Sequence, residues 1–178
     1  MLMGFFSSSL SKDTIRQQEF FDQLKDTNDE DHVYGFGLTL WYIHSEFSIA
    51  LMDKFLGQER LRKYDLEFNS IRKQRFANIW TDSIKEPAHL DKLWADFFAT
   101  GNEASIRKII TKLADLNSSN SYDVVTANSA RWSLTSNSIT HDKVFEVCKN
   151  ELDTPDQVIG DAIRQIISEA EKQRKKKL

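Results

Sequence analysis

Apolar residues between His89 and Leu152 recur at helical spacing in several short segments. Between these segments, a residue that favours the end of a helix is followed by one that favours the start of the next. The clearest run occupies positions i, i+3, i+4, i+7 and i+8, with Leu90, Leu93, Trp94, Phe97 and Phe98. This spacing is typical of an amphipathic helix. Gly101 favours a helix end and Asn102 can cap the next helix, so the junction predicts a tight helical hairpin.

Composition supports the same fold class for the whole chain. The 178 residues include only six Gly and two Pro, which is too few for an architecture of strands and turns. We therefore expect an all-α fold, with a compact multi-helix domain of about seven or eight helices that is built from helical hairpins and is loosely solenoid-like. The expected organisation is a flexible apolar amino terminus (1–10), a single helical domain (11–171) and a basic tail (172–178).

Capping residues and apolar spacing place most of the expected helices. Ser11 can cap a first helix, and Thr154-Pro155 predicts the start of the last one. The apolar run from Phe36 to Leu56 alternates at first like a strand, but its length favours a single helix. The overlapping stretch 33–52 is long enough for a membrane span, yet His44 and Glu46 near its middle favour a buried helix. Further helices are expected over about 58–83 and 122–136.

Charge is unevenly distributed along the chain. The formal net charge is −3, and five of the 24 basic residues lie at the end: Lys172, Arg174, Lys175, Lys176 and Lys177. The other 19 basic residues face 27 acidic residues, so residues 1–171 carry −8. A body of this sign repels phosphate, so nucleic acid is not expected as a partner. The single cysteine cannot form an internal disulfide, which favours a reducing, cytoplasmic location.

Catalytic and metal-binding motifs are absent from the sequence. It has no glycine-rich phosphate loop, no nucleophile elbow and no paired metal-binding histidines. His44 and Glu46 are the nearest approach to an acid–base pair, but at that spacing on a helix they do not face each other. Cys148 lies on an apolar stripe, where a cysteine usually acts as a small hydrophobic residue. We therefore expect a protein that is not an enzyme and has no cofactor and no metal.

Residues 58–80 combine basic and aromatic side chains. Six basic residues outnumber three acidic ones, and Tyr64, Phe68, Phe76 and Trp80 are interleaved with them. This pattern is found in RNA-binding surfaces, but it also fits a helix whose aromatic residues face the core. The favoured interpretation is the second one. Peripheral RNA or membrane association through this helix and the Lys-rich tail remains an alternative.

One pattern resembles that of a known group of proteins. The pattern has four segments in this sequence. They are Leu90-Asp91-x-Leu93-Trp94-x-x-Phe97-Phe98-Ala99-Thr100-Gly101, Arg107-x-Ile109-Ile110, Ala130-x-Trp132-Ser133-Leu134-x-Ser136-Asn137 and His141-x-x-Val144. They resemble an uncharacterised family of helical bacterial proteins with no assigned activity. Asp142 departs from the pattern, which has Pro there. The resemblance implies a bacterial source and an α-helical fold.

The leading functional hypothesis is a non-enzymatic helical module that binds another protein, such as a toxin-neutralising immunity protein or an adaptor. Four tryptophans and twelve phenylalanines on a helical frame motivate it, and the acidic body would attract a basic partner. The candidate interaction residues are Trp94, Phe98, Arg107, Arg131 and Trp132. An alternative is a pocket between helices, around His44 and Glu46, that binds a small apolar molecule or acts as an enzyme. The sequence leaves the oligomeric state open.

Overall fold

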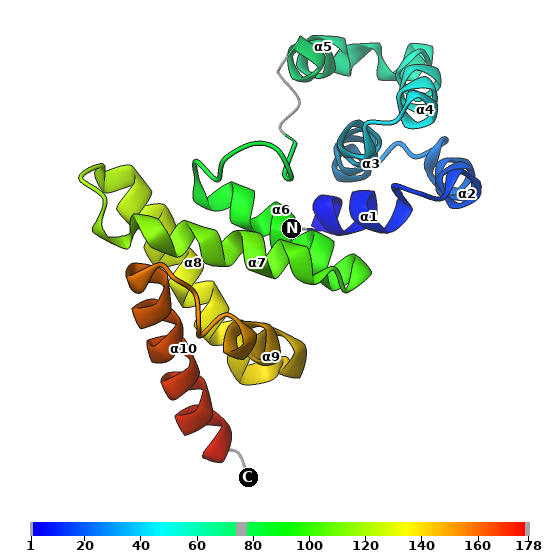
Figure 1. The fold of residues 1–178 in the computed structure, drawn as a ribbon. Coiled ribbons are helices and arrows are strands. Elements are labelled where there is room, and N and C mark those ends of the chain that lie inside the picture. The colour runs from blue at the N-terminus through cyan, green and yellow to red at the C-terminus, as the bar shows by residue number, and fades with distance from the viewer. Residues whose placement is uncertain (1, 74–77, 177–178) are drawn as a thin grey trace. The chain divides into compact units, whose positions relative to one another are not determined.

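The structure is a computed structural model that describes residues 2–73 and 78–176 (Figure 1). Within these ranges it is all-helical, with ten α-helices and two short 3-10 helices, η1 and η2. The elements are α1 (Leu2–Leu10), α2 (Thr14–Leu24), α3 (Glu30–Ile43), α4 (Glu46–Leu56), η1 (Glu59–Tyr64), α5 (Asp65–Lys73), α6 (Pro87–Thr100), α7 (Glu103–Thr111), η2 (Lys112–Asn117), α8 (Ser121–Thr140), α9 (Asp142–Asn150) and α10 (Gln157–Lys175).

Packing divides these helices between two compact units. One comprises residues 1–78 and 98–100, and the other comprises residues 79–97 and 101–178. Each unit has its own hydrophobic cluster. The expectation of a single domain over 11–171, and of a loosely solenoid-like arrangement, stays a prediction.

The first unit is held together by an aromatic cluster. Phe36 of α3 lies at its centre, with ring centroids 4.7 Å from Phe55, 5.3 Å from Phe20 and 5.9 Å from Phe21. These rings come from α2, α3 and α4, so the cluster joins three helices. Edge-to-face ring pairs add stability beyond the area that they bury.

The apolar run from Phe36 to Leu56 forms two helices, and the expectation of a single helix was wrong. His44 adopts a left-handed conformation with φ of 53°, which ends α3. Ser45 and Ser48 then form a reciprocal capping box that starts α4, with side-chain to backbone distances of 3.0 and 3.1 Å. Two serines satisfy backbone donors that a continuous helix would use internally, so the chain turns here.

The amino-terminal segment treated as flexible forms α1, which contacts α3. Phe6 stacks on Phe20 at 5.8 Å, and the carbonyl oxygen of Leu10 accepts a hydrogen bond from Gln17 at 2.8 Å. The prediction that Ser11 caps the next helix was wrong. Asp13 caps α2 instead, and its carboxylate accepts from the backbone N–H of Arg16 at 3.0 Å.

The helix expected over 58–83 is shorter and less regular. It is replaced by η1 and α5, which ends at Lys73, and the described residues from 78 to 86 are not helical. Glu86 is extended, as a residue before proline tends to be, and Pro87 then begins α6. Because η1 is a 3-10 helix, the expected helix over 58–83 still corresponds to a single α-helix, α5. The ten α-helices exceed the expected seven or eight because α1 forms and the 36–56 run is split.

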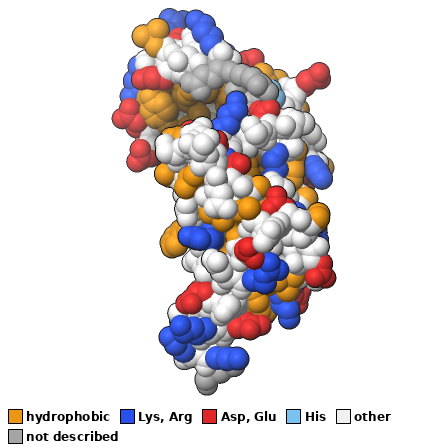
Figure 2. Space-filling model, turned by 60° about the vertical axis from the view of Figure 1, so that its left-hand side comes forward, with side chains coloured by type: hydrophobic (Ala, Val, Ile, Leu, Met, Phe, Trp, Pro, Cys, Tyr) orange, Lys and Arg blue, Asp and Glu red, His pale blue; other side chains and the backbone are white. Residues whose placement is uncertain are grey.

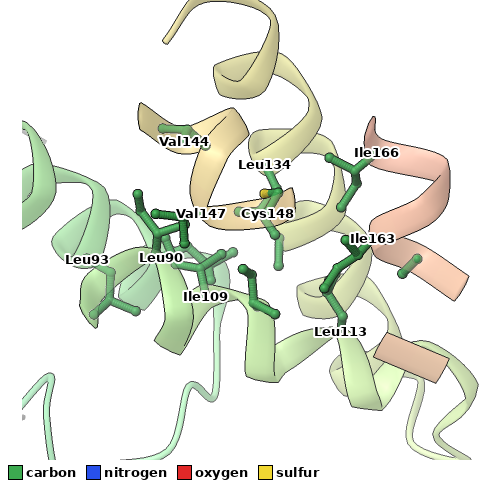
Figure 3. Packing of buried hydrophobic residues seen from close by; sticks show 14 of the residues in the cluster. Leu90, Leu93, Ile109, Leu113, Leu134, Val144, Val147, Cys148, Ile163 and Ile166 are labelled. Atoms are coloured by element: carbon green, nitrogen blue, oxygen red, sulfur yellow. The ribbon is translucent and has the colours of Figure 1, made fainter. Parts of the chain in front are cut away.

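The second unit packs α6 to α10 around an aliphatic core (Figure 3). The expected hairpin between α6 and α7 is confirmed: Gly101 has φ of 71°, and the Asn102 side chain accepts from the N–H of Ala104. In Figure 3, side chains from α6, α7, α8, α9 and α10 converge on one cluster. Its labelled members are Leu90, Leu93, Ile109, Leu113, Leu134, Val144, Val147, Cys148, Ile163 and Ile166.

The last helix differs from the sequence analysis at both ends. Asp156, rather than Thr154, caps α10 and accepts from the N–H of Ile159 at 3.0 Å. At the other end α10 continues to Lys175, into the segment expected to be a tail. Arg174 binds the carbonyl oxygen of Ser138 at 2.8 Å and the carboxylate of Asp142 at 2.6 Å, which ties this end to the body of the unit. Figure 2 shows Lys and Arg side chains gathered at this end of α10.

Candidate functional site

The second unit contains an apolar groove between α6 and α8, called the α6–α8 groove. Its volume is about 670 Å³, and it is open to solvent. Leu90 and Trp94 are buried beneath it, whereas Val125 and Trp132 are exposed along one side. The lining residues are Pro87, Ala88, Leu90, Asp91, Trp94, Val124, Val125, Asn128, Ser129, Trp132 and Ser133.

A hydrogen bond fixes the two walls of the groove to each other. The indole Nε1 of Trp94 in α6 donates to the hydroxyl oxygen of Ser133 in α8 at 3.1 Å. Ser133 in turn donates to the carbonyl oxygen of Ala130, 3.0 Å away. A buried indole N–H needs such a partner, so the groove is held in place without a ligand.

Polar side chains on the α8 wall are turned back onto their own helix. The Asn128 amide donates to the carbonyl oxygen of Val124 at 2.8 Å, and the Ser129 hydroxyl donates to that of Val125 at 3.0 Å. The Asn128 amide oxygen also accepts from Arg131 at 2.9 Å. The groove therefore presents mainly apolar surface, which suits packing against another molecule better than acid–base chemistry.

Two of the five residues predicted for the interaction meet in this groove. Trp94 lies at its base and Trp132 at its edge. Arg131 precedes Trp132 on α8 but lines a separate, more polar groove of about 440 Å³ with Gln157 and Gln165. Phe98 and Arg107 line neither groove, and Phe98 is 37% exposed.

An exposed apolar face of α8 adjoins the groove. Trp132 was predicted as an interaction residue, and the exposed fractions of Val125 and Trp132 are 55% and 73%. Tyr122 is exposed as well. The available signal was the spacing of Tyr122, Val125 and Trp132, which are i, i+3 and i+10 and share a helix face. Periodicity does not reveal which apolar face is covered.

Arg107 belongs to a cluster of ion pairs at the start of α7. It contacts Glu103 at 2.8 Å and Glu151 at 3.0 Å, and Lys143 contacts the other oxygen of Glu103 at 2.5 Å. The hydrogen bonds from Lys143 and Arg107 lower the pKa of Glu103 below its usual 4.5. The cluster joins α7 to α9 and to the turn after α9, so Arg107 has a structural role in this arrangement.

A pH-dependent contribution to stability follows from this cluster. Because the pKa of Glu103 is lower in the folded protein, its charge stabilises the fold above about pH 4.5, and this contribution is lost as the pH falls through the folded-state value. We expect Glu103→Gln to be less stable than the wild type at pH 7, and we expect this difference to shrink as the pH falls below about 4.5. Urea unfolding at pH 7, 5, 4 and 3 measures the difference. A gap that persists unchanged at pH 3 would contradict this origin.

The basic segment 58–80 is largely engaged within the first unit. Arg60 binds the carbonyl oxygens of Lys25 and Thr27, and Arg72 pairs with Asp53 at 2.5 Å. Tyr64 and Phe68 are buried, as the favoured interpretation expected, whereas Trp80 is 43% exposed. Phe76 lies outside the described residues.

Other candidate reactive groups are placed in structural settings. The His44 ring packs edge-on against Trp41 at 5.1 Å, and neither His44 nor Glu46 lines the two grooves above. Burial raises the pKa of the Cys148 thiol to about 11, so it stays protonated at neutral pH. Within the described ranges, no group of three or more His, Cys, Asp or Glu side chains could hold a metal ion. No helix in the described part of the chain has the length and apolarity required to cross a membrane.

Comparison with known proteins adds no family to this description. No protein-family model, curated protein or solved structure matches the chain. The α6–α8 groove is therefore the feature of this protein that indicates its function.

Proposed function

We propose that this protein is a non-enzymatic helical module that binds another protein through the α6–α8 groove. The observation that carries the proposal is the position of Trp132, which is 73% exposed at the edge of an apolar groove. Tryptophan is the residue type most enriched at the energetic centres of protein interfaces. Its position on a long helix keeps the loss of side-chain and backbone freedom on binding small.

The apolar surface around Trp132 supports the same function. Val125 lies along the same side of the groove, and Tyr122 is exposed one turn before it on α8. Single exposed apolar residues are common on soluble proteins, but contiguous ones beside a groove mark interaction sites. A partner that covers this face would remove all three side chains from water.

The proposed biological setting is a bacterial immunity protein or adaptor in the cytoplasm. The charge of −8 over residues 1–171 would attract a basic partner and speed its association. A nuclease toxin has the required charge. This assignment extends the groove proposal and depends on it.

Replacing Trp132 tests the function directly. Tagged wild type, Trp132→Ala and Leu66→Ala proteins are purified from the cells that produce the protein, and co-purifying proteins are quantified by mass spectrometry. We expect one protein in near-stoichiometric amount with the wild type, and at least about 30-fold weaker binding with Trp132→Ala, which corresponds to about 2 kcal/mol. Leu66 is 86% exposed in the first unit, so Leu66→Ala is the matched control and should bind normally.

Two results would refute the proposed function. In the first, Trp132→Ala recovers the same protein as the wild type in the same amount. In the second, no protein is recovered in stoichiometric amount with the wild type. Equal stability of the two variants, measured by urea unfolding, ensures that a loss of binding reflects the surface and not the fold.

A further inference from the structure

The length of the α6–α8 groove suits two to three turns of a helix. Its walls are two helices, and its lining residues on α8 run from Val124 to Ser133. At 1.5 Å per residue this stretch is about 14 Å long, or between two and three helical turns. The α6 wall contributes residues from Pro87 to Trp94, about two turns. A third helix lying between two others is a common solution in helical packing.

Backbone hydrogen bonding gives a second reason to expect a helix. The groove walls lie within α6 and α8, so most of their N–H and C=O groups are already paired inside these helices. Asn128 and Ser129 also donate to carbonyl oxygens of α8. An extended peptide would find few backbone partners here, whereas a helix satisfies its own backbone and offers an apolar stripe.

One charged residue indicates the chemistry of the partner. Of the described residues that line the groove, Asp91 is the one that carries a charge, and it is exposed on α6. It has no hydrogen bond or ion pair within the described part of the chain. Residues 79–178 have 15 acidic and 14 basic residues, a net charge of −1, so the charge preference at the groove comes from Asp91 itself and not from the net charge of its surroundings.

We infer that the partner segment is an amphipathic helix that lays an apolar stripe in the α6–α8 groove and places a Lys or Arg side chain against Asp91. This inference deepens the proposed function and rests on it. Trp132 and Val125 supply the apolar contact at one side, and the carboxylate of Asp91 on the opposite helix sets the charge preference. A helix with an acidic residue at the facing position would be rejected.

Three synthetic helical peptides test the inference. Each has 16 residues with the same leucine stripe, and they differ only in flanking residues, which are Lys, Gln or Glu. Binding of each labelled peptide to the full-length protein is measured by fluorescence anisotropy at physiological salt. The wild type should bind the Lys peptide most tightly and the Glu peptide least. Trp132→Ala should weaken binding of the Lys peptide at least about 30-fold.

A matched pair of variants separates Asp91 from the overall charge. Asp91→Asn should weaken binding of the Lys peptide about two- to fivefold and leave the Gln peptide unchanged. Asp153→Asn makes the same charge change at an exposed residue that does not line the groove, and should have little effect. Equal loss in both variants would overturn the role of Asp91, because it would show that only the net charge matters.

Failure of the inference can be distinguished from failure of the proposed function. Equal binding of the three peptides, preference for the Glu peptide, or binding of none would overturn the inference. If the cellular partner is still lost with Trp132→Ala, the proposed function stands and the partner binds in another form. If that partner is retained with Trp132→Ala, the proposed function itself fails.

Discussion

Phe36→Ala should lower the free energy of unfolding by about 3–5 kcal/mol. Phe36 is 1% exposed, and its ring contacts those of Phe20, Phe21 and Phe55. Removal of the ring leaves a cavity among α2, α3 and α4 that the surrounding rings cannot fill without leaving their own contacts. The loss is large because transfer of the side chain and the remaining cavity both contribute.

Urea unfolding monitored by circular dichroism measures this effect, with Leu66→Ala as the control. Leu66 lies on α5 and is 86% exposed, so its replacement should change the stability by no more than about 0.5 kcal/mol. If Phe36→Ala costs less than about 1 kcal/mol, the aromatic cluster does not have the packing described here.

Leu134→Ala should destabilise the second unit by about 2.7–5 kcal/mol. Leu134 lies on α8 with no exposed surface, and α8 contacts η2, α9 and α10. Trp132 is only two residues away on the same helix but faces solvent, so Trp132→Ala should cost about 0.5 kcal/mol or less. The larger side chain should thus contribute less to stability than the smaller one.

This pair separates folding from binding on a single helix. Unfolding experiments should identify Leu134→Ala as the destabilised variant, and the partner-binding experiment should identify Trp132→Ala as the defective one. Comparable destabilisation by both variants would mean that Trp132 is a core residue and that the α6–α8 groove is not open as described.

The candidate site could be predicted only in part. Trp94 and Trp132 were chosen from the sequence as interaction residues, and both line the groove. Arg107 was chosen as well, but its partners Glu103 and Glu151 come from two parts of the chain. Only the contact with Glu103 follows helix spacing; the contact with Glu151 depends on how α7 packs against the turn after α9. Asp91 was quoted in the sequence pattern, but its position beside the groove depends on α8.

The sequence alone was sufficient to predict helix ends where a residue acts only on its immediate neighbours. Gly101 and Asn102 end one helix and start the next because their conformational and capping preferences are local, and the hairpin is present as expected. The sequence alone was insufficient where two nearby residues could both cap the same helix. Ser11 and Asp13 can both cap α2, and Thr154 and Asp156 can both cap α10, so the wrong residue was chosen each time.

Long-range packing determined which apolar faces are buried. The spacing along α8 shows that Tyr122, Val125 and Trp132 share a face, but that pattern is the same whether the face is covered or exposed. Neighbouring helices cover the opposite face, which carries Ala127, Ala130 and Leu134. The hydrophobic effect favours burial of both faces, and the described residues of the second unit cover only one of them.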